Sequence, residues 1–149
     1  MKTTTNYKNF RDETYKELND FISKNCVWAF GREQTQAKLE ELGLTEQEFV
    51  NQYVGFMGGA MRKDKIKEYA EISKKAHETL VNALKSNFEL AKDAFNYELN
   101  NHECFYTSRF TDAFGALGLT DDEVNNDETL LKAFKEAKKA YWDWACENC

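Results

Sequence analysis

The 149-residue sequence contains no proline, which is the most unusual feature of its composition. A chain of this length carries roughly seven prolines at the average usage of about 5%. The absence excludes collagen-like, polyproline II and proline-rich linker structures. With 42% hydrophobic and 14% aromatic residues the chain can bury a core, which excludes a disordered protein. We therefore expect one helix-rich domain over residues 1–149.

The sequence also lacks an excess of positive charge and a long apolar run. Twenty basic residues face 26 acidic ones, so the net charge is −6. We therefore expect neither direct nucleic-acid binding nor a membrane span. Residues 1–75 carry 13 basic and 12 acidic side chains, whereas residues 76–149 carry 7 and 14. The acidic C-terminal half favours a basic partner.

A secretory signal is missing from the first residues, which have no apolar segment and no small-residue cleavage site. This predicts a cytoplasmic protein. The cysteines Cys26, Cys104, Cys146 and Cys149 should then be reduced, because disulfides are rare in that compartment.

Apolar residues recur at helical spacing along most of the chain. Capping boxes at Thr45–Glu48 and Thr120–Glu123 mark two helix starts, and Gly43 has the position of a helix C-cap. Asp64 is a natural N-cap for the longest pattern, which is either one helix or two joined near residues 86–87. The expected helices cover residues 5–23, 37–42, 45–57 and 64–100. A short helix capped by Thr111 or Ser108 should end at residues 117–118, and a final helix with its apolar stripe from residue 130 should run almost to the end of the sequence.

Two short segments are instead aromatic and β-prone, Cys26–Phe30 and Cys104–Thr107. An isolated strand leaves its backbone groups unpaired, so the two should pair as an antiparallel ribbon. Residues 42–49 and 117–124 match each other, which suggests half-repeats 1–60 and 64–149 about a pseudo-twofold axis. The same residues are also common at turns between two helices. Both interpretations, an internal repeat and an unrelated similarity of two turns, stay open. The predicted fold class is mainly α (α+β), with helices around a two-stranded ribbon.

Metal binding and catalysis both have incomplete signatures. On a strand His102 and Cys104 share one face, and with Cys146 and Cys149 they could form a Cys₃His zinc site. Packing cysteines are the more common case, so we expect no metal and no cofactor. His102 and Cys104 are also poorly placed as base and nucleophile, and no third group orients the histidine. We expect no enzymatic activity.

A binding site near the ribbon is the remaining hypothesis. Residues 58–64 combine two glycines, basic side chains and a helix start, which are the ingredients of an anion site, although a plain turn explains them equally. Near the second segment, Glu98, Asn101 and His102 predict a polar network. The candidate ligand or partner residues are Gln34, Arg62, Lys63, Asp64, Glu98, Asn101, His102 and Glu103.

Four stretches of the sequence carry a family resemblance: residues 29–34, 58–64, 97–103 and 116–120. Their motifs, Ala-Phe-x-x-Glu-Gln, Gly-Gly-x-x-Arg-Lys-Asp, Tyr-Glu-Leu-x-Asn-His-Glu and Ala-Leu-Gly-Leu-Thr, resemble a domain-of-unknown-function family of small phage, prophage and plasmid proteins. The chain departs from that pattern at Thr35, where an aromatic residue is usual, and at Cys104, where tyrosine is usual. The resemblance implies an accessory protein of a mobile element and assigns no activity.

Two functions follow as expectations. The first is a non-enzymatic protein that binds a host protein, as an inhibitor of host defence of the anti-CRISPR kind would. The alternative is a small-ligand module that binds a nucleotide or another anion near the ribbon. A homodimer is compatible with either function.

Overall fold

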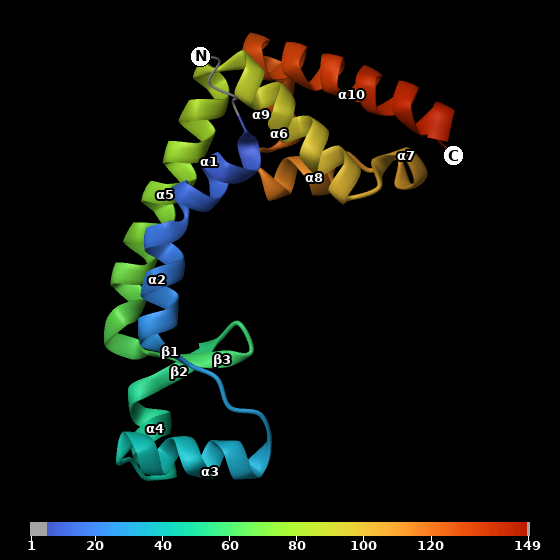
Figure 1. The fold of residues 1–149 in the computed structure, drawn as a ribbon. Helices are drawn as coiled ribbons and strands as arrows, with labels where there is room; N and C mark the ends of the chain where they lie inside the picture. The colour runs from blue at the N-terminus through green and yellow to red at the C-terminus, as the bar shows by residue number, and fades with distance from the viewer. Residues whose placement is uncertain (1–5, 149) are drawn as a thin grey trace. The chain divides into compact units, whose positions relative to one another are not determined.

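The computed structural model describes residues 6–148, which form two compact units (Figure 1). Unit 1 comprises the described residues up to Tyr15 together with those from Lys75 onward, and unit 2 is Lys16–Lys74. The fold is mainly α-helical with one three-stranded antiparallel sheet, which confirms the predicted fold class. Within residues 6–148, no helix is both long and apolar enough to cross a membrane.

Unit 2 contains the sheet, three helices and the first part of α5. Its elements are α2 (Lys16–Asn25), β1 (Cys26–Val27), α3 (Gly31–Leu42), α4 (Glu46–Gln52), β2 (Tyr53–Phe56), β3 (Gly59–Arg62), the 3₁₀ turn η1 (Lys63–Lys65) and the start of α5 (Ile66–Ser86). The strand order is β1-β3-β2, so β3 is the central strand. On this sheet Met61 is fully buried.

A β-hairpin in unit 2 corrects the helix predicted over residues 45–57. The helix ends at Gln52, and β2 then pairs with β3 from Tyr53–Arg62 to Phe56–Gly59. The two residues between the strands, Met57 and Gly58, have φ values of 47° and 83°, as a type I′ turn requires. The apolar residues after position 52 fit the period of a helix and that of a strand equally well. The turn at Met57 and Gly58 favours the strand.

The predicted ribbon is wrong in its second strand. Cys104–Thr107 is a short helix, α7, and β1 pairs with β3 instead, with Cys26 opposite Met61 and Val27 opposite Ala60. The hairpin supplies the hydrogen-bonding partner that β1 needs. In α7 the Phe105 ring packs against the core and lies 5.5 Å from the Trp142 ring, whereas Tyr106 is exposed. Left-handed residues at Glu103 and Ser108 bound this helix on either side.

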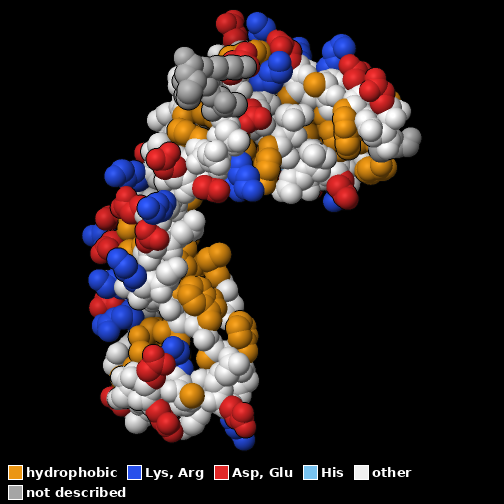
Figure 2. All heavy atoms as spheres, viewed as in Figure 1, with side chains coloured by type: hydrophobic (Ala, Val, Ile, Leu, Met, Phe, Trp, Pro, Cys, Tyr) orange, Lys and Arg blue, Asp and Glu red, His pale blue; other side chains and the backbone are white. Residues whose placement is uncertain are grey.

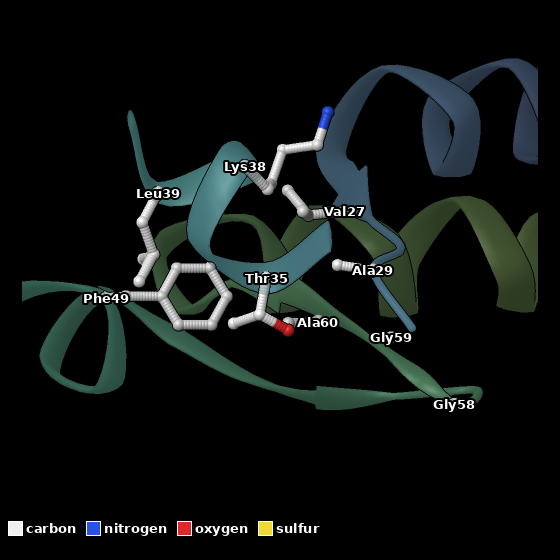
Figure 3. Close-up of a pocket in the computed structure, with 9 residues that line it drawn as sticks. All are labelled: Val27, Ala29, Thr35, Lys38, Leu39, Phe49, Gly58, Gly59 and Ala60. Atoms are coloured by element: carbon white, nitrogen blue, oxygen red, sulfur yellow. The ribbon is translucent and has the colours of Figure 1, made fainter. Parts of the chain in front are cut away.

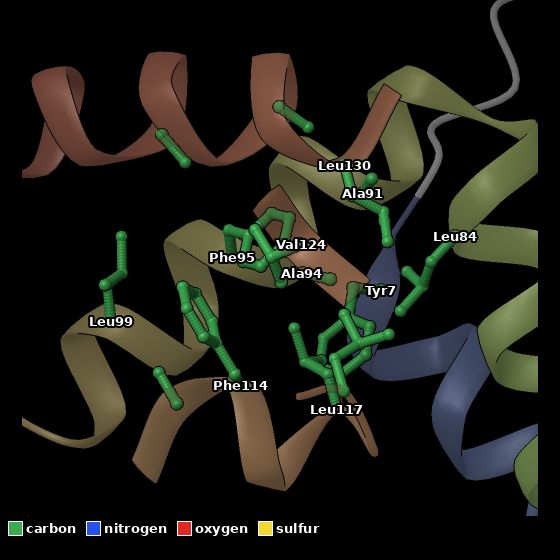
Figure 4. Close-up of a cluster of buried hydrophobic side chains, with 14 of the residues drawn as sticks. Tyr7, Leu84, Ala91, Ala94, Phe95, Leu99, Phe114, Leu117, Val124 and Leu130 are labelled. Carbon is green, nitrogen blue, oxygen red and sulfur yellow. The ribbon is translucent and has the colours of Figure 1, made fainter. Parts of the chain in front are cut away.

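Unit 1 is an all-helical bundle around α6. Its elements are α1 (Tyr7–Thr14), the last part of α5, α6 (Phe88–Asn101), α7 (Cys104–Thr107), α8 (Thr111–Ala116), α9 (Asp121–Asn126) and α10 (Glu128–Asn148). Helix α6 packs most extensively against α10. The core includes Phe95, Phe114, Leu99 and Leu130 (Figure 4). The rings of Phe95 and Phe114 meet edge to face at 5.7 Å.

Helix boundaries follow the capping signals in most places. Both capping boxes are present, at Thr45 and at Thr120. The two glycines that precede them have similar left-handed φ values, 70° at Gly43 and 74° at Gly118. The long pattern divides into α5 and α6, and the Asn87 side chain caps α6 by accepting from the Leu90 amide at 3.1 Å. The matched turns thus share one geometry.

Two smaller expectations are wrong. The single helix predicted over residues 5–23 is interrupted at Tyr15, whose ψ of 4° leaves the helical region. Asp64 is not the N-cap of α5, because α5 begins at Ile66 after the 3₁₀ turn. The Asp64 carboxylate instead accepts hydrogen bonds from Arg62.

Candidate functional site

An apolar pocket of about 180 Å³ lies in unit 2 between the sheet and helices α3 and α4 (Figure 3). Its lining residues are Val27, Ala29, Thr35, Lys38, Leu39, Phe49, Gly58, Gly59 and Ala60. Of these, only Thr35 and Lys38 have polar side chains, and the Lys38 ammonium pairs with the Glu41 carboxylate at 3.0 Å. Because an apolar cavity of about 150 Å³ can hold benzene, this pocket has room for one apolar side chain.

The register of the sheet explains the floor of the pocket. Val27 and Ala60 are directly opposite each other, so their side chains share one face of the sheet. The next strand has Gly55 opposite Ala60, again on that face. Ala60, which lines the pocket, has only a methyl group on this face and so leaves space beneath α3 and α4.

Gly59 allows a close approach that no other residue would permit. A Cβ atom at this position would overlap the Val27 carbonyl oxygen and lie 2.6 Å from Cδ1 of Trp28. The glycine thus lets β1 and the Trp28 indole pack directly against β3. The indole remains 40% exposed, between two residues that line the pocket.

Exposed apolar side chains are concentrated in unit 2. Of the eight large hydrophobic residues that are exposed within the described part of the chain, six belong to this unit, and Figure 2 shows hydrophobic side chains gathered there. Phe30 is 69% and Met57 74% exposed. Clustered exposure of this kind marks interaction surfaces more often than scattered single residues do. The six are Trp28, Phe30, Leu42, Val50, Val54 and Met57.

The predicted site residues of unit 2 are mostly engaged with their own neighbours. The side-chain oxygen of Gln34 accepts a hydrogen bond from the Phe30 amide at 2.8 Å, at the start of α3. Arg62 donates to both oxygens of Asp64, at 3.1 and 3.0 Å, and holds the pKa of that carboxyl below its usual value. Lys63 is exposed in η1. The structure thus brings Arg62 and Asp64 together as an exposed ion pair.

The other four predicted residues belong to unit 1. Glu98 is only 2% exposed, and one oxygen lies 3.2 Å from Nε2 of His102, so this part of the predicted polar network is present. Asn101 and Glu103 are exposed. The eight predicted site residues are thus divided between the two units. Binding of a nucleotide or another anion by all eight together stays a prediction.

Two residues of the polar network were missed by the sequence reasoning, Tyr7 and Arg11. The Tyr7 hydroxyl donates to Glu98 Oε1 at 3.3 Å, and Arg11 Nη1 lies 3.8 Å from the same oxygen. The backbone amide of Tyr7 also donates to Asp93 at 2.7 Å. These contacts attach α1 to α6 through a separation of about ninety residues, which no local pattern reveals.

Tyr7 gives the network a pH dependence. Burial, and then the nearby Glu98 carboxylate, raise the pKa of the Tyr7 phenol well above its ordinary value. The folded state therefore favours the neutral phenol, and this stabilisation is fully present below the unfolded pKa of about 10. It is lost as the pH rises from there toward the folded pKa. We expect urea midpoints to fall from pH 9 to pH 11 more steeply for the wild type than for Tyr7→Phe. Parallel curves would contradict this.

The cysteines do not form a described metal site. Burial raises the pKa of the Cys104 and Cys26 thiols, which disfavours the thiolate that metals bind. The Cys104 thiol donates to the Arg109 carbonyl at 3.1 Å. Cys146 is exposed, and Cys149 lies outside the described residues. Across residues 6–148, no three His, Cys, Asp or Glu side chains are grouped to hold a metal ion.

Comparison with known proteins places the chain in a family. A family model described as a family of unknown function (DUF7659) matches residues 6–140. The chain belongs to this family. The DUF7659 match includes all of unit 2, most of unit 1 and all the motifs on which the sequence resemblance rests. No curated protein and no solved structure matches the chain.

The pocket itself was missed by the sequence reasoning. Its residues come from four separate segments, and no pattern in the sequence indicates that these segments meet. The available signal was the β-prone segment Tyr-Val-Gly-Phe at residues 53–56, followed by a two-residue Met-Gly connection, which is typical of a hairpin. Recognising that hairpin would have placed Ala60 opposite another strand.

Proposed function

We propose that this DUF7659 protein is a non-enzymatic binding module, and that the pocket of unit 2 receives an apolar side chain of a partner protein. The observation that carries the proposal is the open apolar pocket among exposed hydrophobic residues. Interfaces are anchored by aromatic or aliphatic side chains that fill such pockets, surrounded by contacts that exclude water. Trp28 and Phe30 supply surrounding contacts of this kind.

The charge around the pocket indicates the chemistry of the partner. Helices α3 and α4 and their connection, residues 31–52, carry two basic side chains and five acidic ones. The acidic residues are Glu33, Glu40, Glu41, Glu46 and Glu48. A partner that presents its apolar anchor beside lysine or arginine side chains would complement this surface.

The sequence motifs support a biological setting for this binding. A bacterial cytoplasm, a phage or plasmid origin and a host protein as the partner agree with the motif resemblance described above. Inhibition of a host defence system is the most specific form of the proposal. It requires only that binding at unit 2 block a surface which the host protein needs.

A pocket-filling substitution tests the proposal. In Ala60→Leu the larger side chain extends into the pocket from β3. In Thr35→Leu it extends into the pocket from α3, where Thr35 is exposed at the pocket wall. We expect each variant to retain its helical circular dichroism spectrum. Binding should weaken at least about tenfold, a loss typical of a blocked anchor pocket. The matched control is Ala140→Leu, on an exposed position of α10.

Two measurements give the readout. Amide NMR spectra of the chain are titrated with a short peptide that has one phenylalanine between lysines, and with the same peptide carrying alanine. In the wild type, only the phenylalanine peptide should shift the amide signals of Val27 and Ala60. In the filled variants, neither peptide should shift the Val27 signal. Quantitative pull-downs from bacterial lysates should then show a partner that the filled variants lose and Ala140→Leu keeps. Equal capture by all variants would refute the proposal.

A further inference from the structure

A second inference concerns the edge of the sheet formed by β2, one of its two edge strands. Strand β2 pairs with β3 on one side, and otherwise it contacts mainly α4. Within residues 6–148, no strand pairs with its other side. Such an edge presents backbone N–H and C=O groups to an incoming strand. We propose that two copies of this chain pair through β2 and form one continuous six-stranded antiparallel sheet.

The chemistry of β2 favours a second copy as the occupant. Soluble proteins commonly block a free edge with lysine, proline or a bulge, and β2 (Tyr-Val-Gly-Phe) has none of these. Residues 49–61 contain no Asp, Glu, Lys or Arg, so two copies can approach along this edge without opposing like charges. An isologous pair about a twofold axis also closes and leaves no further free β2 edge.

The pleat of the strand selects the register. Residues that face each other across an antiparallel pair lie on the same side of the sheet, so opposed positions must differ by an even number. With Gly55 on the axis, Gly55 faces Gly55 of the second copy, and Val54 faces Phe56. Val54 is 41% exposed, so the pairing buries apolar surface on both sides of the axis. An axis at Val54 would instead oppose Gln52 and Phe56, which is a poorer pair.

A cross-linking experiment tests both the strand and its register. An ideal Cβ at Gly55 has no atom within 4 Å, so Gly55→Cys should fold normally. Opposed Cα atoms in an antiparallel pair are about 4.5–5.5 Å apart, which is within disulfide range. In a Cys146→Ser, Cys149→Ser background we expect mild oxidation to give a covalent dimer for Gly55→Cys. Val50→Cys, exposed on α4, is the control and should remain monomeric on a non-reducing gel.

Light scattering of the uncross-linked protein provides an independent readout. The wild type should have the mass of two chains at high micromolar concentration. Val54→Lys should be monomeric, because a lysine would face Phe56 in the apolar seam, whereas Val50→Lys should remain dimeric. A monomeric wild type, equal cross-linking of the two cysteine variants, or a dimeric Val54→Lys would overturn the proposal. None of these outcomes affects the pocket, since Ala60→Leu tests that site separately.

Discussion

Replacing Phe95 by alanine is expected to destabilise the protein by about 3–5 kcal/mol, the cost typical of truncating a buried phenylalanine. Phe95 is fully buried on α6, and its ring packs edge to face against Phe114 on α8 and Phe134 on α10. The substitution removes all of these ring contacts and leaves a cavity at the centre of unit 1. Urea unfolding followed by circular dichroism measures the loss as a lower midpoint.

The control for this experiment is Phe30→Ala. Phe30 is the same residue type but is largely exposed, so its truncation should change the unfolding free energy by less than about 0.5 kcal/mol. The comparison separates the effect of burial from that of deleting an aromatic ring. A Phe95→Ala midpoint close to that of Phe30→Ala would show that the described core is wrong.

Glu98→Ala should have the next largest effect, a loss of about 2–3 kcal/mol. The substitution leaves the buried Tyr7 hydroxyl without its acceptor and separates Arg11 and His102 from their common carboxylate. Orphaning a buried donor costs about 1–3 kcal/mol. Arg11 and His102 side chains remain about one-third exposed, so water can solvate them and the loss stays below that of a fully buried ion pair.

Glu89→Ala is the matched control, because Glu89 is exposed in the first turn of the same helix. A double-mutant cycle with Tyr7→Phe then isolates the hydroxyl–carboxylate term. We expect a coupling free energy of about 1 kcal/mol or more between the two positions. Additive effects of Glu98→Ala and Tyr7→Phe would show that the hydrogen bond contributes nothing to stability.

Local signals in the sequence predicted most of the helices. The helix starts predicted at Thr45 and Thr120 are confirmed by capping hydrogen bonds in the structure. They were predictable because these bonds span only three residues. The polar pair of Glu98 and His102 was also predictable, since residues four apart share one helix face. The predicted strand at Cys104–Thr107 was wrong, because a segment of four residues with two aromatics fits either a strand or a single helical turn.

The sequence by itself determined that this protein is helical, where most of its helices begin and end, and that the turns before Thr45 and Thr120 are alike. Only the tertiary structure decided the strand partners, the burial of Glu98 against Tyr7, and the pocket between β3 and α3. The division has a physical cause. Caps and helical faces depend on neighbours a few residues away, whereas strand pairing and cavities depend on contacts between distant segments. The absence of proline acts locally, because it leaves helices uninterrupted. The proposed binding surface depends on contacts between segments that are distant in the sequence.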